Sequence, residues 1–433
     1  MRNREGFRSW MQELCALCCA FVLLTSVGVM AQTPSPRTWE QVRQSFEQNN
    51  PTLLAGRLNI DESKAQEITA FLRPNPQFTQ SSDGTQLRPY NGVWQPFVGT
   101  QFSSGLSYLH EREHKRELRL ESARKGTAVA ASTQADLERT LLFGLRSAFV
   151  STLQAKAVFE LAKDNLAYYD HVLDISRIRF QNGDIAQVDL DRLELQRVQY
   201  ESDLQTAEVS LRTAKITLLT FLNERTPVEQ FDVSGSFDFD DQLMPRDEFR
   251  KIALDARPDL KAAVKAVDKA RTDYKLAVAN GSTDPTFGTW YSYNPSFNNP
   301  FAHQTLGANI AIPLRVFDRN QGEKLRTKLD ITRNEKLRDA AEAQVFSDVD
   351  SGYATLASAV VLLRPYKTKY LQQSVRVRDT IYFSYQNGAA SLLDFLNAES
   401  DYRTVQRSYV NLVGSYLMAA AQLNLAVGRE VIQ

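Results

Sequence analysis

Apolar residues recur at helical spacing over most of this chain. Between His110 and Leu222 there is no proline, and the segment is rich in Ala, Leu, Glu, Arg and Gln. The pattern predicts a helix from about Arg112 to Arg179, roughly 100 Å long at 1.5 Å per residue, and a second helix after the turn "QNG". Helices of this length exceed a globular core, so we expect coiled-coil packing along a rod or tube.

The second half of the chain has a similar helical pattern. It runs from about Arg319 to Ser384 and onward to Gly428, and Pro365 predicts a kink within it. Each half also opens with a shorter helix. Thr38 with Gln41 forms a capping-box signal in the first half, and Pro245 precedes "RDEFRKIAL" in the second. These helices should stop at "RPNP" and at "NGSTDP".

Two strand candidates follow the shorter helix in each half. In "QTLGANIAIPL" and "FVGTQFSSGLSY" apolar residues alternate with small or polar ones, and "QFTQSSDGTQL" and "TFGTWYSYN" are the expected partners. Strands of about 10 residues with one apolar face suit a transmembrane barrel. An ordinary soluble sheet shows the same alternation, so the pattern alone leaves both interpretations open.

The two halves are related in sequence. "RFQNGDIAQVDLDRLE" from Arg179 aligns without a gap to "SYQNGAASLLDFLNAE" from Ser384, an offset of 205 residues. Upstream, "NPTLLAGRLNIDESKAQ" from Asn50 resembles "RPDLKAAVKAVDKARTD" from Arg257. We therefore expect two tandem repeats. The predicted domains are a signal peptide at 1–31, a first repeat at 32–222, a connector at 223–245 and a second repeat at 246–433.

The N-terminus differs from the rest of the chain. Three arginines precede the apolar run "LCALCCAFVLLTSVGVM", and Val29 and Ala31 fit a cleavage site after Ala31, which predicts a secretory signal peptide. An uncleaved anchor is the alternative. All three cysteines lie in this run, so the mature chain would have no thiol. No other segment has 18 consecutive apolar residues, so an exported form would enter a membrane only as a barrel.

Charge excludes one class of partner. The 51 basic residues balance 51 acidic residues without a long run of either sign, which argues against nucleic-acid binding.

The most specific single motif is "HEREH", His110 to His114, which matches the zinc-peptidase pattern H-E-x-x-H. No third ligand follows in "KRELRLESA", and nothing in the local sequence singles out Glu138 as a distant glutamate ligand. A zinc peptidase is therefore a remote alternative.

The tandem halves, the strand pairs and the "QNG" turns together resemble the outer-membrane efflux protein family, the TolC-like channels, over essentially the whole mature chain. The segment "IPLRVFDRNQGE" from Ile312 resembles the family's strand-to-helix junction, especially in its heavy-metal branch. The junction residues that match are Pro313, Asp318, Arg319, Asn320 and Gly322. The segment "YQNGAASLLDFLNAES" from Tyr385 is similar to the periplasmic tip of the family.

The resemblance implies an α+β membrane protein that forms a homotrimer. Four strands per protomer would close a transmembrane β-barrel in the outer-membrane lipid, and long antiparallel helices would continue it as a coiled-coil barrel across the periplasm. The implied partners are a periplasmic adaptor and an inner-membrane pump, of the resistance-nodulation-division type. The implied function is a passive, gated exit path for metal cations or other small molecules, without enzymatic activity or a cofactor.

The resemblance also assigns residues at the tip. Tyr385 matches the tip tyrosine of the family, Asp394 and Asn397 match its two aperture aspartates, and Ala390 replaces a linking arginine. In the first repeat Asp189 corresponds to Asp394. The tip turns themselves would centre on Gly183 and Gly388, around which the adaptor of the family docks. A simpler interpretation is that Asp189 and Asp394 only cap helix starts.

A soluble periplasmic adaptor or structural rod is the second alternative, because such proteins also contain long paired helices. Four strands with an apolar face argue against it, since an adaptor has no need of a lipid-facing band.

Overall fold

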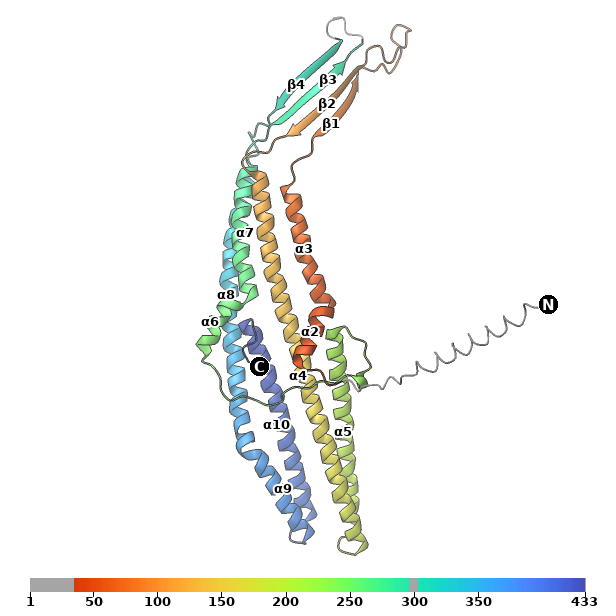
Figure 1. The fold of residues 1–433 in the computed structure, drawn as a ribbon, viewed down its shortest axis with the longest axis vertical. Coiled ribbons are helices and arrows are strands. Elements are labelled where there is room, and N and C mark those ends of the chain that lie inside the picture. Colours follow the sequence, from red (N-terminus) through yellow and green to blue (C-terminus); the bar gives the residue numbers. More distant parts are fainter. Residues whose placement is uncertain (1–34, 296–302, 433) are drawn as a thin grey trace, which may run out of the picture.

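The computed structural model describes residues 35–295 and 303–432, so the predicted signal peptide at 1–31 lies outside the described residues. The molecule is elongated, with a sheet at one end and helices along its length (Figure 1). The elements of the first half are α2 (Trp39–Asn49), α3 (Pro51–Phe71), β1 (Gln77–Asp83), β2 (Gln101–Leu109), α4 (Lys115–Gln181), α5 (Gln187–Leu222) and a 3-10 turn (Val228–Gln230). Those of the second half are α6 (Arg246–Ala256), α7 (Pro258–Asn280), β3 (Thr286–Tyr293), β4 (Gln304–Ala311), α8 (Gln321–Pro365), a π-helical segment (Tyr366–Tyr370), α9 (Leu371–Gln386) and α10 (Leu392–Val427).

The shorter helices begin where the sequence predicts, but each is divided in two. The backbone N–H of Thr38 donates to Gln41 Oε1 at 3.0 Å, as expected for the capping box. A break that we did not predict follows at Asn50 and at Arg257, both of which are extended, with ψ of 117° and 122°. The cause is the proline that follows each of them, because proline disfavours the helical conformation in the preceding residue. Asn50 then caps α3 by accepting from Leu53 N at 3.0 Å.

The four strands form one antiparallel sheet in the order β1-β2-β3-β4. The register and the strand alternation place large apolar and aromatic side chains together on one face. That face carries Phe78, Phe102, Leu106, Tyr108, Phe287, Tyr291, Tyr293, Leu306 and Ile310. The opposite face is small or polar apart from Leu109 and Trp290, and the Trp290 ring lies against Gly307. The outer edges of β1 and β4 have no strand beside them among the described residues.

The strands are shorter than the predicted 10 residues. They contain 7, 9, 8 and 8 residues. β1 ends before Gly84, whose φ of 78° turns the chain, and β4 ends two residues before Pro313, which cannot donate a ladder hydrogen bond.

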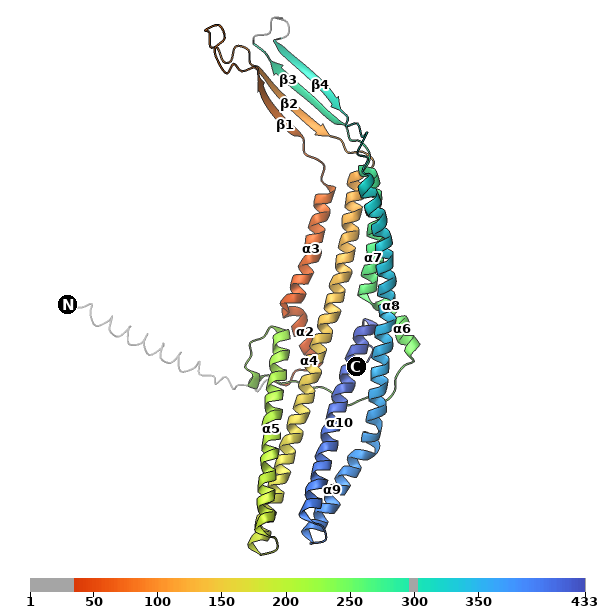
Figure 2. The same cartoon turned by 180° about the vertical axis from the view of Figure 1, so that it is seen from behind.

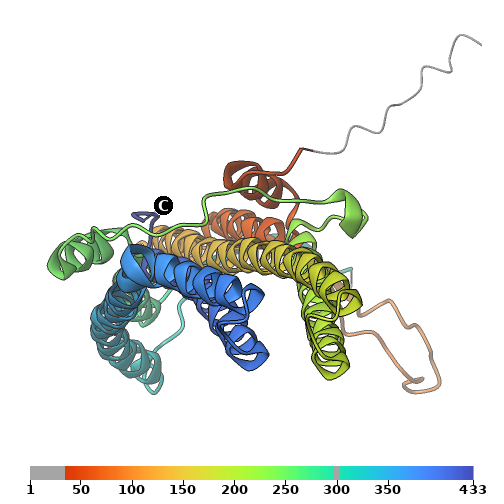
Figure 3. The ribbon, with the colours of Figure 1, turned by 90° about the horizontal axis from the view of Figure 1, so that it is seen from below.

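The long helices form a curved layer, and α2, α6 and the connector lie along its convex side (Figure 3). The helix α4 has 67 residues and begins at Lys115, three residues after the predicted start. In the second half the helix is interrupted by the π-helical segment directly after Pro365, where the sequence predicts a kink.

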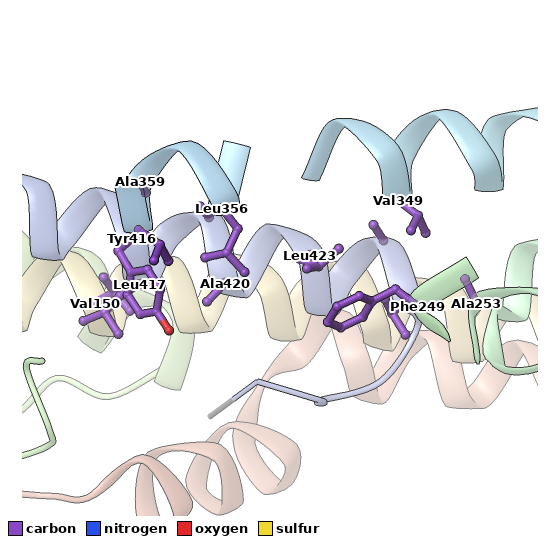
Figure 4. Packing of buried hydrophobic residues seen from close by; sticks show 14 of the residues in the cluster. Val150, Phe249, Ala253, Val349, Leu356, Ala359, Tyr416, Leu417, Ala420 and Leu423 are labelled. Carbon is purple, nitrogen blue, oxygen red and sulfur yellow. The ribbon is translucent and has the colours of Figure 1, made fainter. Parts of the chain in front are cut away.

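The largest apolar cluster among the described residues lies at mid-length and joins α4, α6, α7, α8 and α10. Figure 4 shows Phe249 and Ala253 of α6 with Val349 and Leu356 of α8 and Leu423 of α10. The helix α10 is apolar enough over one 18-residue window to span a membrane, but 56% of that window is buried in the protein. Its hydrophobicity is thus used in packing against the neighbouring helices.

Candidate functional site

The end of the molecule opposite the sheet consists of two helical hairpins, α4–α5 and α9–α10, which lie side by side (Figures 1 and 2). We call their turns and the adjoining helix ends the tip. Gly183 and Gly388 occupy the same place in the two turns, with φ of 80° and 75°. The following residue closes each turn, as in Ala389 N to Ser384 O at 2.8 Å. A left-handed residue is required here, which explains both glycines.

Asp189 and Asp394 each lie at the third position of the helix that follows a turn. The Asp394 carboxylate accepts from Ser391 N at 3.0 Å and from Ser391 Oγ at 2.7 Å, while Ser391 Oγ accepts from Asp394 N at 3.2 Å. These bonds lower the pKa of Asp394. Asp394 therefore caps its helix within one protomer, whereas the N-cap residue before Asp189 is Ala186, which has no side-chain acceptor.

Tyr385 is buried at the contact between the two hairpins, with 6% of its surface exposed. Its ring stacks on Phe395 at 5.4 Å, and the guanidinium of Arg179 from α4 lies 5.0 Å from its centre. Burial raises the pKa of the Tyr385 hydroxyl, Arg179 opposes this, and Asp189 adds to it. The structure thus brings Tyr385 and Asp189 together, while Asn397 is exposed on α10.

A cluster of aromatic and arginine side chains joins the hairpins, and the sequence did not identify it. Arg378 lies between the rings of Tyr168 and Tyr402, at 4.8 and 4.1 Å. Arg403 lies 4.2 Å from the ring of Tyr200 and 3.3 Å from an oxygen of Asp203. These residues come from α4, α5, α9 and α10, so no local spacing in the sequence connects them. We call them the tip cluster, together with Tyr169, Val172, Leu173, Leu190, Leu193, Tyr385, Leu392 and Phe395.

The junction between β4 and α8 is formed by the residues that the resemblance singled out. Asn320 precedes α8 in a left-handed conformation, with φ of 61°. Its N–H donates to Asp318 Oδ1, and its side-chain amide donates to Ala277 O, both at 2.8 Å. Pro313, Arg319 and Gly322 are exposed around it. The junction is therefore a built turn that ties α8 to the end of α7.

The zinc motif does not have the geometry of a metal site. His110 to His114 lie in the turn before α4, and His114 itself is left-handed with φ of 54°, so the imidazoles are not one helical turn apart. Glu111 is paired with Arg119 through a 2.8 Å hydrogen bond. Within residues 35–295 and 303–432 no group of three or more metal-ligating side chains occurs. The helix begins at Lys115, three residues after the predicted start at about Arg112, because two consecutive left-handed residues, Glu113 and His114, precede it.

Comparisons with known proteins agree with this geometry. The family model of the outer membrane efflux protein matches residues 42–224 and 250–429. A pyoverdine export outer membrane protein, OpmQ of Pseudomonas aeruginosa, is 25% identical over 338 residues, covering 76% of this chain and 70% of that protein. A cobalt-zinc-cadmium resistance protein, CzcC of Cupriavidus metallidurans, is 21% identical and covers 92% of this chain and 91% of that protein.

The fold is also similar to solved structures. The structure of CusC, which is described in terms of transmembrane channel formation, aligns with a TM-score of 0.73 at 18% identity, over 90% of this chain and 92% of that one. This likeness concerns the fold alone. The family model covers both halves of the chain with their strands and tip hairpins, and the chain therefore belongs to the outer membrane efflux protein family.

Proposed function

We propose that this outer-membrane efflux channel component works as a homotrimer, in which three copies of the four-stranded sheet close a twelve-stranded barrel. The observation that carries the proposal is the sheet itself, which has one apolar face and two open edges. Backbone groups at an open edge cannot stay unpaired in lipid, so the edges of β1 and β4 need strands from other copies. The number three comes from the resemblance to the family.

Exposed apolar residues on the outermost helices support assembly with further copies. Leu54 and Leu58 of α3 are 40% and 61% exposed, and Leu325 and Leu329 of α8 are 59% and 60% exposed. Apolar side chains at such spacing on a helix mark a packing face. Pairing α3 of one copy with α8 of the next would continue the curved helical layer into a tube. The two tandem repeats would then give each protomer two similar segments of the tube wall.

The tip would serve as the periplasmic gate and as the docking place for partners. In this proposal the aperture is lined by Asp189, Asp394 and Asn397, and a periplasmic adaptor docks around the turns at Gly183 and Gly388. The adaptor would connect the channel to an inner-membrane pump, which would supply the energy for export, since the channel itself does no covalent chemistry. The mature chain would be exported by its cleaved signal peptide.

Single-channel conductance tests the channel function. The purified protein in a planar bilayer should form cation-selective pores, and Asp394→Asn should lower cation selectivity by removing negative charge from the aperture. Unchanged conductance and selectivity would argue against an aperture role for Asp394. Recovery of the protein in the soluble periplasmic fraction, without a trimeric band on mild gels, would reject the channel altogether and favour the adaptor or rod.

The cargo requires a separate experiment. By their names, one relative exports pyoverdine and another confers resistance to cobalt, zinc and cadmium, and we propose metal cations as the first class to test. Deletion of the gene should sensitise cells to one class in a panel of metals and organic compounds. Sensitivity to organic compounds alone would reject the metal assignment.

A further inference from the structure

A carboxyl group is buried where the two tip hairpins meet. Glu399 lies two turns into α10 and is 3% exposed. None of the described residues donates a hydrogen bond to its Oε1. Burying a charged carboxylate without full compensation is unfavourable, and glutamine or an apolar residue would fill the same space without that cost. The position therefore suggests a role for the ionisable group itself.

The groups that face Glu399 come from every helix packed around it. They are Tyr168 and Tyr169 of α4, Tyr200 of α5, Arg378, Asp379 and Tyr382 of α9, and Arg403 of α10. The nearest cation is Arg378, whose Nε lies 4.0 Å from Oε1. Arg378 is also paired with Asp379 at 2.8 Å, and Arg403 with Asp203. Each arginine thus interacts with a second carboxylate, so neither neutralises Glu399 alone.

This environment favours the neutral acid. Burial raises the pKa of Glu399 to about 7, against the opposing effects of Arg378, the Tyr168 hydroxyl and Arg403. A cavity of ≈ 280 Å³ lies between α4, α5 and α10, and its lining includes Tyr200 and Arg403, two of the groups that face Glu399. Water in this cavity would reach the immediate neighbours of the carboxyl group.

We propose that Glu399 makes the contact between the α4–α5 and α9–α10 hairpins sensitive to pH, so that its ionisation favours separation of the hairpins and opening of the periplasmic end. The geometry carries this step, because Glu399 lies on α10 and faces both hairpins from their shared interior. The link from hairpin separation to opening rests on the proposed channel function. The pH-dependent separation of the hairpins does not depend on that function.

The direction follows from the two protonation equilibria. In the packed state the acid holds its proton up to about pH 7, whereas a solvated glutamate loses it near its ordinary pKa of 4.5. Packing is therefore fully favoured below pH 4.5, weakens as the pH rises from 4.5 to about 7, and changes no further above that. Over this window the ratio of packed to separated hairpins should fall by up to about two orders of magnitude.

Distance measurements between the tips test the proposal. Asp184→Cys and Ala389→Cys place spin labels on the two exposed turns of the mature chain, which has no other cysteine after the predicted cleavage. Labelled chains are diluted with unlabelled ones so that most assemblies carry one labelled protomer. The distance should lengthen between pH 4.5 and pH 8. Glu399→Gln, which mimics the neutral acid, should keep the short distance at both values.

The matched control is Asp401→Asn, which removes an exposed carboxylate from the same helix and should behave like the unmodified chain. An unchanged distance in the parent protein, or the same lengthening in Glu399→Gln, overturns the proposal. Infrared titration supplies a measurement that needs no variant to fold. The carbonyl band of a protonated carboxyl should disappear near pH 7, and its disappearance entirely below pH 5 also overturns the proposal.

Conductance recorded under the same conditions separates this proposal from the channel function. Pores with an invariant tip distance would leave the channel intact and reject the role of Glu399. A pH-dependent distance without pores at any pH would reject the channel and support the proton-sensitive contact.

Discussion

Lys115 shows how one buried charge fixes the place where the sheet meets the helices. Its side chain is 3% exposed, and Nζ donates to Asp284 Oδ2 at 2.6 Å and to Ser282 O at 3.1 Å. The other oxygen of Asp284 accepts from Arg112 N at 2.9 Å. The turn between β2 and α4 is thereby tied to the turn between α7 and β3. In the sequence these residues belong to two polar segments, 167 to 172 positions apart, and nothing in either segment predicts the contact.

Asp284→Asn should destabilise the protein in a pH-dependent way. Burial would raise the pKa of Asp284, but the bonds from Lys115 and Arg112 outweigh it and lower that pKa. The stabilisation is present above the ordinary value of 3.8 and is lost as the pH falls through the lowered pKa. We expect a loss of about 2 kcal/mol at pH 7, which shrinks below pH 4 as Asp284 is protonated in the parent protein.

Urea unfolding in detergent at pH 7 and pH 3 measures this difference. The control is Asp61→Asn, because Asp61 belongs to an exposed ion pair with Lys64, which should change the unfolding free energy by less than about 0.5 kcal/mol. A pH-independent loss in Asp284→Asn would contradict the ionic origin of the effect.

At the scale of elements, the break between α6 and α7 joins parts of the chain that are far apart. Arg257 at this break is 2% exposed. It pairs with Asp259 at 2.6 Å and with Asp348 of α8 at 2.7 Å, and it donates to Ala426 O near the end of α10 at 3.3 Å. The proline that divides the helix thus places an arginine where three helices meet. A continuous helix would not hold this residue in an extended conformation.

Arg257→Met should lower the free energy of unfolding by about 3 kcal/mol. The substitution keeps most of the side-chain volume but leaves two partly buried carboxylates without their cation. Thermal or urea unfolding followed by circular dichroism measures the loss. Arg246→Met is the matched control, since Arg246 is half exposed and lies 3.8 Å from Asp350. The control should cost less than about 1 kcal/mol, and equal losses in the two variants would contradict the assigned role of Arg257.

At the scale of the whole molecule, the two faces of the sheet differ in polarity and therefore suit different surroundings. Leu306 and Thr305 are neighbours on β4 and point to opposite faces. Leu306 is 81% exposed in the single chain, next to Tyr291 across the strands. In the proposed barrel the apolar face would contact lipid, and the polar face would line a water-filled interior.

Leu306→Lys should therefore reduce assembly, with a cost of about 2–4 kcal/mol per chain if the residue lies near the middle of the bilayer. Thr305→Lys should be tolerated, because the polar face would line the interior. Folding into lipid vesicles, followed by the shift in mobility between heated and unheated samples, measures both. Equal folding yields of the two variants would contradict the assignment of the faces.

The sequence by itself determined the local elements of this protein. Period-two alternation predicted β2 and β4, and β1 and β3 were expected as their partners. Helical spacing predicted the long helices, and Gly183 and Gly388 marked the turns because only a left-handed residue closes them. Its errors were also local. The prolines after Asn50 and Arg257 divided two helices, and the zinc motif lay before α4 because the residues that precede that helix are left-handed.

Only the tertiary structure decided which side chains meet at the tip. Arg179 reaches Tyr385 from a helix that is more than 200 positions away in the chain, and Glu399 is surrounded by residues of four helices. Periodicity predicts which face of a helix is apolar, but it does not specify the partner helix or the depth at which a charge is buried. Burial and the field of neighbouring charges depend on the packed arrangement, and they set the protonation state of Glu399.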